Sequence, residues 1–210
     1  MFKHDALIIC VAVLSAIMLS ACAGPGVTSG NALSGSGKYA TREYALDGFT
    51  GIQANGGFQV TVTGGDSYKV SVTSDDNVLD SISVKKQVKD LVISFDTSKY
   101  SSIRTTKLQV AVTLPELESV RLNGGSSLQS VGAAPKSMNL SINANGGSQV
   151  DLGGMAADKV SVTLNGGSQA MVNAKTSLDY DLNGGSRLQY TGNPTIGSSK
   201  SEGGSQATKY

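Results

Sequence analysis

The sequence predicts an all-β protein, namely a right-handed parallel β-helix, or β-solenoid, built from Asn-Gly-Gly-Ser repeats of about 20 residues and preceded by a β-hairpin-rich N-terminal part. Three observations predict this fold. Apolar and polar residues alternate in short runs from Tyr39 onward, which is the period of a half-buried strand. One five-residue turn recurs through the second half of the chain. Glycine is abundant, at 26 of 210 residues, and no long segment has apolar residues at helical spacing.

The first 22 residues, MFKHDALIICVAVLSAIMLSAC, have the layout of a secretory signal. Lys3 precedes an apolar run that is too short to span a bilayer comfortably. The run leads into Leu19-Ser20-Ala21-Cys22, which resembles the lipobox of bacterial lipoproteins. The resemblance implies a signal peptide over residues 1–21, acylation of Cys22 and, because Ala23 follows, export to the outer membrane of a Gram-negative cell. An ordinary signal peptide with an incidental cysteine is the alternative.

Residues 22–38 form a segment rich in glycine, serine and alanine, with hardly any charge. This composition is typical of a flexible tether between a lipid anchor and a folded domain. A poorly packed first strand is the alternative.

Residues 39–120 make up the N-terminal β part. The runs 58–63 and 68–73 alternate on either side of Gly64-Gly65-Asp66, which predicts a β-hairpin. A single helical turn is expected near Asp76–Leu79. Further strands are expected at 81–84, 91–95 and 108–114, the last of them closed by Pro115 because proline cannot donate to a strand ladder.

Residues 121–210 carry the repeated turn. Its copies stand at 122–126, 144–148, 164–168 and 182–186, with a degenerate copy, SEGGS, at 201–205. A short alternating strand precedes each turn and another follows it. A repeat of this length cannot bury a core of its own, so we expect neighbouring copies to stack and pair strand to strand.

The asparagines of the turns, Asn123, Asn145, Asn165 and Asn183, fall at equivalent positions. Stacking would place each amide over the next, so we expect a structural ladder of hydrogen bonds, with Gly-Gly supplying the positive φ of the corner. Asn123 begins the predicted ladder, so its replacement is expected to cost less stability than that of Asn165. The alternative is that the asparagine column binds a ligand.

The residue after each turn forms a second column, which is polar and nearly uncharged. Its members are Ser127, Gln149, Gln169, Arg187 and Gln206. Two interpretations remain open: a face that hydrogen-bonds carbohydrate, and the solvated corner of a stack.

The chain offers little catalytic chemistry. Its only histidine, His4, and its only cysteines, Cys10 and Cys22, all lie within the first 22 residues. A mature chain would therefore lack a Ser-His-Asp or Cys-His arrangement and the usual zinc ligands. Basic and acidic residues number 17 and 16, so no charge footprint for nucleic acid is present. We expect no catalytic residue, no cofactor and no metal site.

An enzyme is nevertheless the alternative function. A polysaccharide-acting β-helix enzyme would need paired carboxylates in a groove. Asp179 and Asp181 share one face of an expected strand and are the basis for this alternative.

Two stretches carry a family resemblance. They are FTGIQANGGFQVTVTGGDSYKVSVTSDDNVLDSISVKKQVKDLVIS, residues 49–94, and LQVAVTLPELESVRLNGGSSLQ, which begins at Leu108. Together they resemble the putative autotransporter adhesin head GIN domain, over about residues 43–210. The resemblance implies β-helical structure and brings no catalytic residues. It favours a non-enzymatic, lipid-anchored cell-envelope protein that acts in adhesion or surface interaction. The expected partners are the membrane, through acyl chains on Cys22, and an envelope glycan or surface protein, but no nucleic acid.

Overall fold

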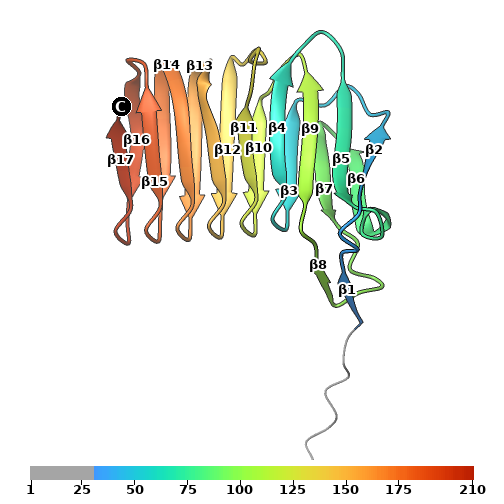
Figure 1. Ribbon diagram of the computed structural model, residues 1–210. Coiled ribbons are helices and arrows are strands. Elements are labelled where there is room, and N and C mark those ends of the chain that lie inside the picture. Colours follow the sequence, from blue (N-terminus) through green and yellow to red (C-terminus); the bar gives the residue numbers. More distant parts are fainter. Residues whose placement is uncertain (1–30) are drawn as a thin grey trace, which may run out of the picture.

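The computed structural model describes residues 31–210, and these residues form β-strands with one short 3-10 helix, η1 (Leu79–Ser81) (Figure 1). The signal sequence, Cys22 and the first part of the expected tether lie outside the described residues. The strands are β1 (Ala32–Ser34), β2 (Tyr39–Tyr44), β3 (Gly51–Asn55), β4 (Gln59–Gly64), β5 (Lys69–Asp75), β6 (Ile82–Gln87), β7 (Asp90–Phe95), β8 (Ser102–Arg104), β9 (Leu108–Leu114), β10 (Ser119–Asn123), β11 (Ser127–Ser130), β12 (Asn139–Asn145), β13 (Gln149–Asn165), β14 (Gln169–Leu182), β15 (Arg187–Thr191), β16 (Thr195–Ser201) and β17 (Gln206–Lys209).

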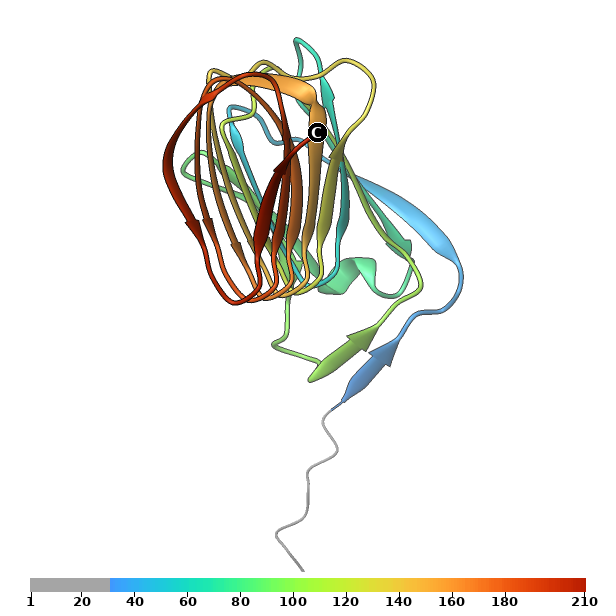
Figure 2. The ribbon, with the colours of Figure 1, turned by 90° about the vertical axis from the view of Figure 1, so that its left-hand side faces the viewer.

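Fifteen of these strands form one sheet, in the order β2-β5-β9-β4-β11-β13-β12-β10-β3-β7-β6, with β14 to β17 continuing from β13. The pairs β2/β5, β5/β9 and β6/β7 are antiparallel, whereas the remaining pairs are parallel. The long strand β13 pairs with β11 through its first residues and with β12 through its last ones. The sheet therefore curls around an interior and forms a nearly closed barrel, as the view along the stack shows (Figure 2).

This architecture corrects the predicted fold class. The protein is all-β, but a right-handed parallel β-helix of Asn-Gly-Gly-Ser repeats behind a separate hairpin-rich part is wrong. The described residues form a nearly closed barrel from a single sheet of mixed parallel and antiparallel strands. The prediction failed because alternation with a period of two is common to both strand directions and does not reveal which strands are neighbours.

The hairpin predicted over 58–73 is also wrong. Its two strands, β4 and β5, do not pair with each other, because β9 lies between them, parallel to β4 and antiparallel to β5. The alternating residues do face the core as expected, since Val60, Val62, Val70 and Val72 are all buried. The pattern thus identified the inward faces, but the partner strand lies 34 or more residues further along the chain, the shortest separation being that of Ser74 and Leu108.

The interior is filled by aliphatic side chains from paired positions on successive strands. One column contains Ile52, Val120, Ile142 and Val162, which pair in register and are each at most 1% exposed. Tyr180 continues this column and is partly buried against the core. Such columns remove apolar surface from water along the whole stack, which is the main force that holds the sheet curled.

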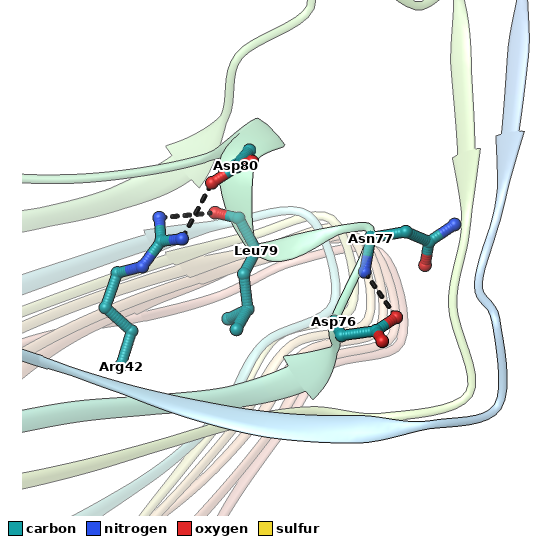
Figure 3. Close-up of polar contacts among 5 residues, drawn as sticks. All are labelled: Arg42, Asp76, Asn77, Leu79 and Asp80. Atoms are coloured by element: carbon teal, nitrogen blue, oxygen red, sulfur yellow. Dashed lines mark hydrogen bonds and ion pairs between the residues drawn. The ribbon is translucent and has the colours of Figure 1, made fainter.

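The two ends of the 11-strand path, β2 and β6, are connected through η1. Arg42 on β2 donates to the carbonyl oxygen of Leu79 at 3.4 Å and to the carboxylate of Asp80 at 2.7 Å (Figure 3). Because β6 begins directly after η1, this arginine bridges the seam of the barrel. Both charged side chains are substantially exposed, so the ion pair itself contributes little to stability.

The N-terminal strand β1 lies outside the barrel and pairs in parallel with β8 (Figure 1). Residues 32–34 of the expected tether thus form a strand, which was the alternative for that segment. The chain then reaches the carboxylate of Asp75, which is fully buried and accepts a hydrogen bond from the Gly37 amide at 2.7 Å. Next to it, Asn77 donates to the carbonyl oxygen of Ser34 at 2.8 Å. These contacts fasten the segment before β2 to the end of β5.

Candidate functional site

The repeated turn has the same backbone in every copy. Both glycines have positive φ, for example 67° at Gly124 and 75° at Gly125, and in the four Asn-Gly-Gly-Ser copies the asparagine lies at the end of its strand or directly after it. In these four copies the serine after the glycines is buried, and its hydroxyl donates to the carbonyl oxygen of the asparagine, as Ser148 does to Asn145 at 2.8 Å. Two consecutive positive φ angles make a tight turn that glycine adopts without steric cost.

The structure brings the four predicted asparagines into one column. The side-chain amide of each donates to the amide oxygen of the one before it: Asn145 to Asn123 at 3.0 Å, Asn165 to Asn145 at 2.9 Å, and Asn183 to Asn165 at 3.3 Å. The side-chain nitrogens of all four, and the side-chain oxygens of Asn123, Asn145 and Asn165, therefore bond within the protein. This geometry favours a structural role for the column over the ligand-binding alternative.

The ladder has a member that sequence reasoning missed. Asn123 donates to Asn55 at 2.7 Å, and Asn55 belongs to an earlier turn, Asn55-Gly56-Gly57-Phe58. This turn stands 68 residues before Asn123 and has phenylalanine in place of serine, so it fell outside the period of about 20. The Asn-Gly-Gly triplet by itself would have been enough to recognise this turn in the sequence.

The column of residues that follow the turns lies on the outer face of the sheet. Successive members are in register: Ser127 pairs with Gln149, Gln149 with Gln169, Gln169 with Arg187, and Arg187 with Gln206. The structure adds two glutamines to this column, because Gln59 pairs with Ser127 on one side and with Gln109 on the other. Gln59 follows the missed first turn and was detectable from the sequence, whereas Gln109 in β9 follows no such turn.

These side chains line a hollow of about 940 Å³ on the outer surface, which we call the trough. Its walls are the outward residues of β5, β9, β4, β11, β13, β14, β15 and β17. A smaller hollow of about 630 Å³, between β2, β5 and β9, shares Ser71 and Ala111 with the trough and extends it toward Tyr44 and Tyr68. The two hollows therefore adjoin on the outer face of β5 and β9.

The trough is polar and almost neutral. Asp151 and Arg187 are the charged side chains among its lining residues, and their charges are opposite. Of the side-chain hydrogen bonds found in residues 31–210, none involves Gln59, Gln149, Gln169 or Gln206. The trough thus presents amide donors and acceptors that the described part of the protein leaves available.

The carboxylates considered for an enzyme lie elsewhere. Asp179 and Asp181 are on the second half of β14 and line neither hollow. Each serves a local structural contact, since Asp179 accepts a hydrogen bond from the Ser198 amide at 2.7 Å and Asp181 one from the Asn183 side chain at 2.8 Å. Over the described range 31–210, no cluster of three acidic side chains is arranged to hold a metal ion.

Comparison with known families identifies the chain. The model of the family described as "putative auto-transporter adhesin, head GIN domain" matches residues 48–138 and 133–194. The chain belongs to this family. The resemblance seen in the sequence is therefore confirmed, and membership indicates a protein of the cell envelope or surface whose family description is that of an adhesin and not of an enzyme.

Solved structures share the fold of this GIN-domain protein at low sequence identity. A putative adhesin from Bacteroides fragilis is 21% identical with a TM-score of 0.58, over 85% of this chain and 100% of the other. One from Parabacteroides merdae is 16% identical, with a TM-score of 0.52, over 86% and 99% of the two chains. A putative lipid binding protein from Parabacteroides distasonis is also 16% identical, with a TM-score of 0.52, over 86% and 100%. At these identities the likeness shows the fold alone.

A search of curated proteins found no match to this chain. Between residues 31 and 210, the structure contains no helix of the length and apolar character needed to cross a bilayer.

Proposed function

We propose that this GIN-domain protein is a non-enzymatic, lipid-anchored module of the cell envelope that attaches to an envelope or surface partner through the trough. The observation that carries this proposal is the row of exposed amide side chains with no partner inside residues 31–210. Exposed groups that converge on a groove are the ordinary signature of a binding face, and the groove holds no paired carboxylates for catalysis.

Anchoring is the second part of the proposal. Acyl chains on Cys22 would hold the protein in the outer membrane of a Gram-negative cell, since several chains give stable attachment where one gives only marginal binding. The described chain begins close to β1, which lies with β8 below the other strands, on the side of the molecule that carries β2 and β5 (Figure 1).

Two experiments test the proposal. The Cys22→Ala variant is expected to leave the membrane fraction of fractionated cells, and its retention there would contradict lipid anchoring.

The second experiment tests the trough. The detergent-solubilised full chain is mixed with isolated envelopes and sedimented. A Gln149→Val, Gln169→Val variant is expected to lose binding, because two adjacent amides at the centre of the trough are removed. Valine favours strands, so the sheet should persist.

A matched control sits on the opposite outer face. Ser141 and Ser161 are exposed, pair in register on neighbouring strands and line neither hollow. The Ser141→Val, Ser161→Val variant should bind envelopes like the natural protein. Equal binding by the natural protein and both variants would show that the trough is not the attachment face.

A further inference from the structure

We propose that the ligand of the trough is an uncharged polysaccharide chain that lies across the strands, along the glutamine column. This inference rests on the proposed function and gives the binding face a ligand class. Four features of the trough support it: its free amides, its charge balance, its scarcity of apolar groups and its regular repeat.

The free amides match the hydrogen-bonding groups of a sugar. A primary amide offers two N–H donors and one carbonyl acceptor, and a sugar hydroxyl both donates and accepts. Gln59, Gln109, Gln149, Gln169 and Gln206 bring such groups to one row of the trough. A ligand that both donates and accepts along its whole length satisfies them best.

The other outer face of the barrel provides an internal comparison. Its corresponding row, formed by paired positions on β10, β12, β13 and β14, contains Arg121, Asn143 and Asp181. Arg121 pairs with Asp90 at 2.6 Å, Asn143 accepts from Asn145 at 2.7 Å, and Asp181 accepts from Asn183. Arg121, Asn143 and Asp181 are thus used within the protein, whereas the trough glutamines make no such contact within residues 31–210.

The charge balance and the polarity of the trough argue against nucleic acid and lipid as its ligands. The opposite charges of Asp151 and Arg187 leave the lining of the trough with no net positive charge to attract a polyanion such as nucleic acid. Ala111 and Met171 are the only apolar side chains that point outward from the strands of the trough. A lipid tail needs a mainly apolar pocket, so a lipid ligand does not fit this lining.

The regular repeat favours a polymer over a single sugar. The row recurs once per strand on seven strands, from β9 through β4, β11, β13, β14 and β15 to β17. At roughly 4.8 Å between strands, it is about 29 Å long. A second row, including Thr61, Gln129, Gln189 and Thr208, runs beside it. Many weak contacts along one chain add up, whereas a single sugar unit would meet only one or two of them.

The test is a binding assay with defined polymers. The full chain in detergent micelles is sedimented with insoluble cellulose, chitin and starch granules, and with immobilised heparin as a polyanion. We expect binding to at least one neutral polymer and none to heparin. The Gln149→Val, Gln169→Val variant should bind that polymer at least tenfold more weakly, and the Ser141→Val, Ser161→Val variant should bind normally. Circular dichroism of each variant verifies that it is folded.

Length dependence tests the repeat directly. Soluble fragments of the bound polymer with two sugar units should compete at least tenfold more weakly than fragments long enough to span the trough. Any one of four results would overturn the inference. They are binding to heparin alone, binding to none of the neutral polymers, equal competition by short and long fragments, and unchanged binding by the trough variant. If the trough variant loses envelope binding while no neutral polymer binds, the ligand class is wrong and the proposed function stands.

Discussion

The asparagines of the ladder differ in the number of ladder hydrogen bonds that they make, and this difference can be measured as a difference in stability. Asn165 has neighbours on both sides: it donates to Asn145 and accepts from Asn183. Its backbone φ is not positive, so alanine would fit the turn without strain. Asn165→Ala should therefore lose two hydrogen bonds, or about 1–3 kcal/mol of unfolding free energy. Denaturant titration at fixed pH measures this loss.

The structure changes the expectation for the ladder end. The sequence placed that end at Asn123, but Asn123 also has two ladder neighbours, Asn55 and Asn145. Asn123→Ala should cost as much as Asn165→Ala. The smaller loss, about 0.5–1.5 kcal/mol, is expected for Asn55→Ala, because Asn55 accepts only one ladder bond. Negligible losses at all three positions would refute the structural role of the ladder.

The two glycines of one turn provide a second comparison at the residue scale. Gly184 and Gly185 have φ of 65° and 77°, a region that costs other residues roughly 1–2 kcal/mol. A Cβ on Gly184 would lie 3.3 Å from the backbone nitrogen of Gly166, whereas one on Gly185 meets nothing within 4 Å. Both alanine variants should lower the denaturation midpoint, and Gly184→Ala should lower it further. The reverse order would contradict close stacking of the turns.

Residue-level features were predictable wherever the sequence repeats at a constant interval. Asn145, Asn165 and Asn183 could be aligned because consecutive copies are similar in length. Asn55 could not be aligned by period, because β5, η1 and β6 to β9 are inserted between the first turn and the second. For the same reason the trough was recognised only in part: five residues of its row follow repeated turns, but Gln109 arrives on a strand with no turn before it.

At the scale of elements, the junction between β5, β8 and the segment before β2 depends on one buried carboxylate. Asp75 accepts hydrogen bonds from the Thr105 hydroxyl at 2.5 Å, the Gly37 amide at 2.7 Å and the Thr106 amide at 3.1 Å. The Thr105 hydroxyl, followed by the two backbone amides, lowers the pKa of Asp75 below its ordinary value of 3.8, although burial opposes this shift. The ionised form is thus the one that the fold binds.

This lowered pKa gives the junction a defined pH dependence. The folded-state pKa lies below the unfolded one, so the stabilisation is fully present above about pH 4 and is lost as the pH falls through the folded value. Limited proteolysis with pepsin should therefore cut the segment around Gly37 increasingly below pH 4. Asp75→Asn should expose the same segment to a neutral protease at pH 7. Equal cleavage of the natural protein and the variant at pH 7 would contradict this role.

Element positions were predictable where element pairings were not. Most expected strands exist close to their predicted ranges, because alternation reports which side chains face the core. Pairing depends on contacts between distant segments. Nothing local to β4 and β5 reveals that β9 separates them, and nothing local to β3 reveals that it stacks on β10. The closure of the sheet into a barrel with antiparallel strands at one end followed from these non-local pairings.

At the scale of the whole molecule, the inner face, the turns and the outer face of the barrel carry different kinds of side chain. Inward columns supply the core, the turn asparagines connect successive strands, and the outer face of β4, β11, β13 and β14 is the face that we propose contacts a partner. The sequence contained this polar column but could not decide between a binding face and a solvated corner. Our proposal of a binding face rests on the hollow over this column, part of which is lined by β5 and β9 through their non-local placement beside β4.

The central claim is that a partner occupies the trough, and site-specific labelling tests it most directly. Cys10 lies within the expected signal peptide and the sulfur of Cys22 would be acylated, so the substitutions Gln169→Cys in the trough and Ser161→Cys on the opposite face would each introduce one free thiol into the mature protein. Each full-length variant is labelled with a maleimide, with and without isolated envelopes. We expect envelopes to slow labelling at position 169 at least fivefold and to leave labelling at position 161 unchanged. Equal rates at position 169 with and without envelopes, or protection of position 161 alone, would contradict the claim.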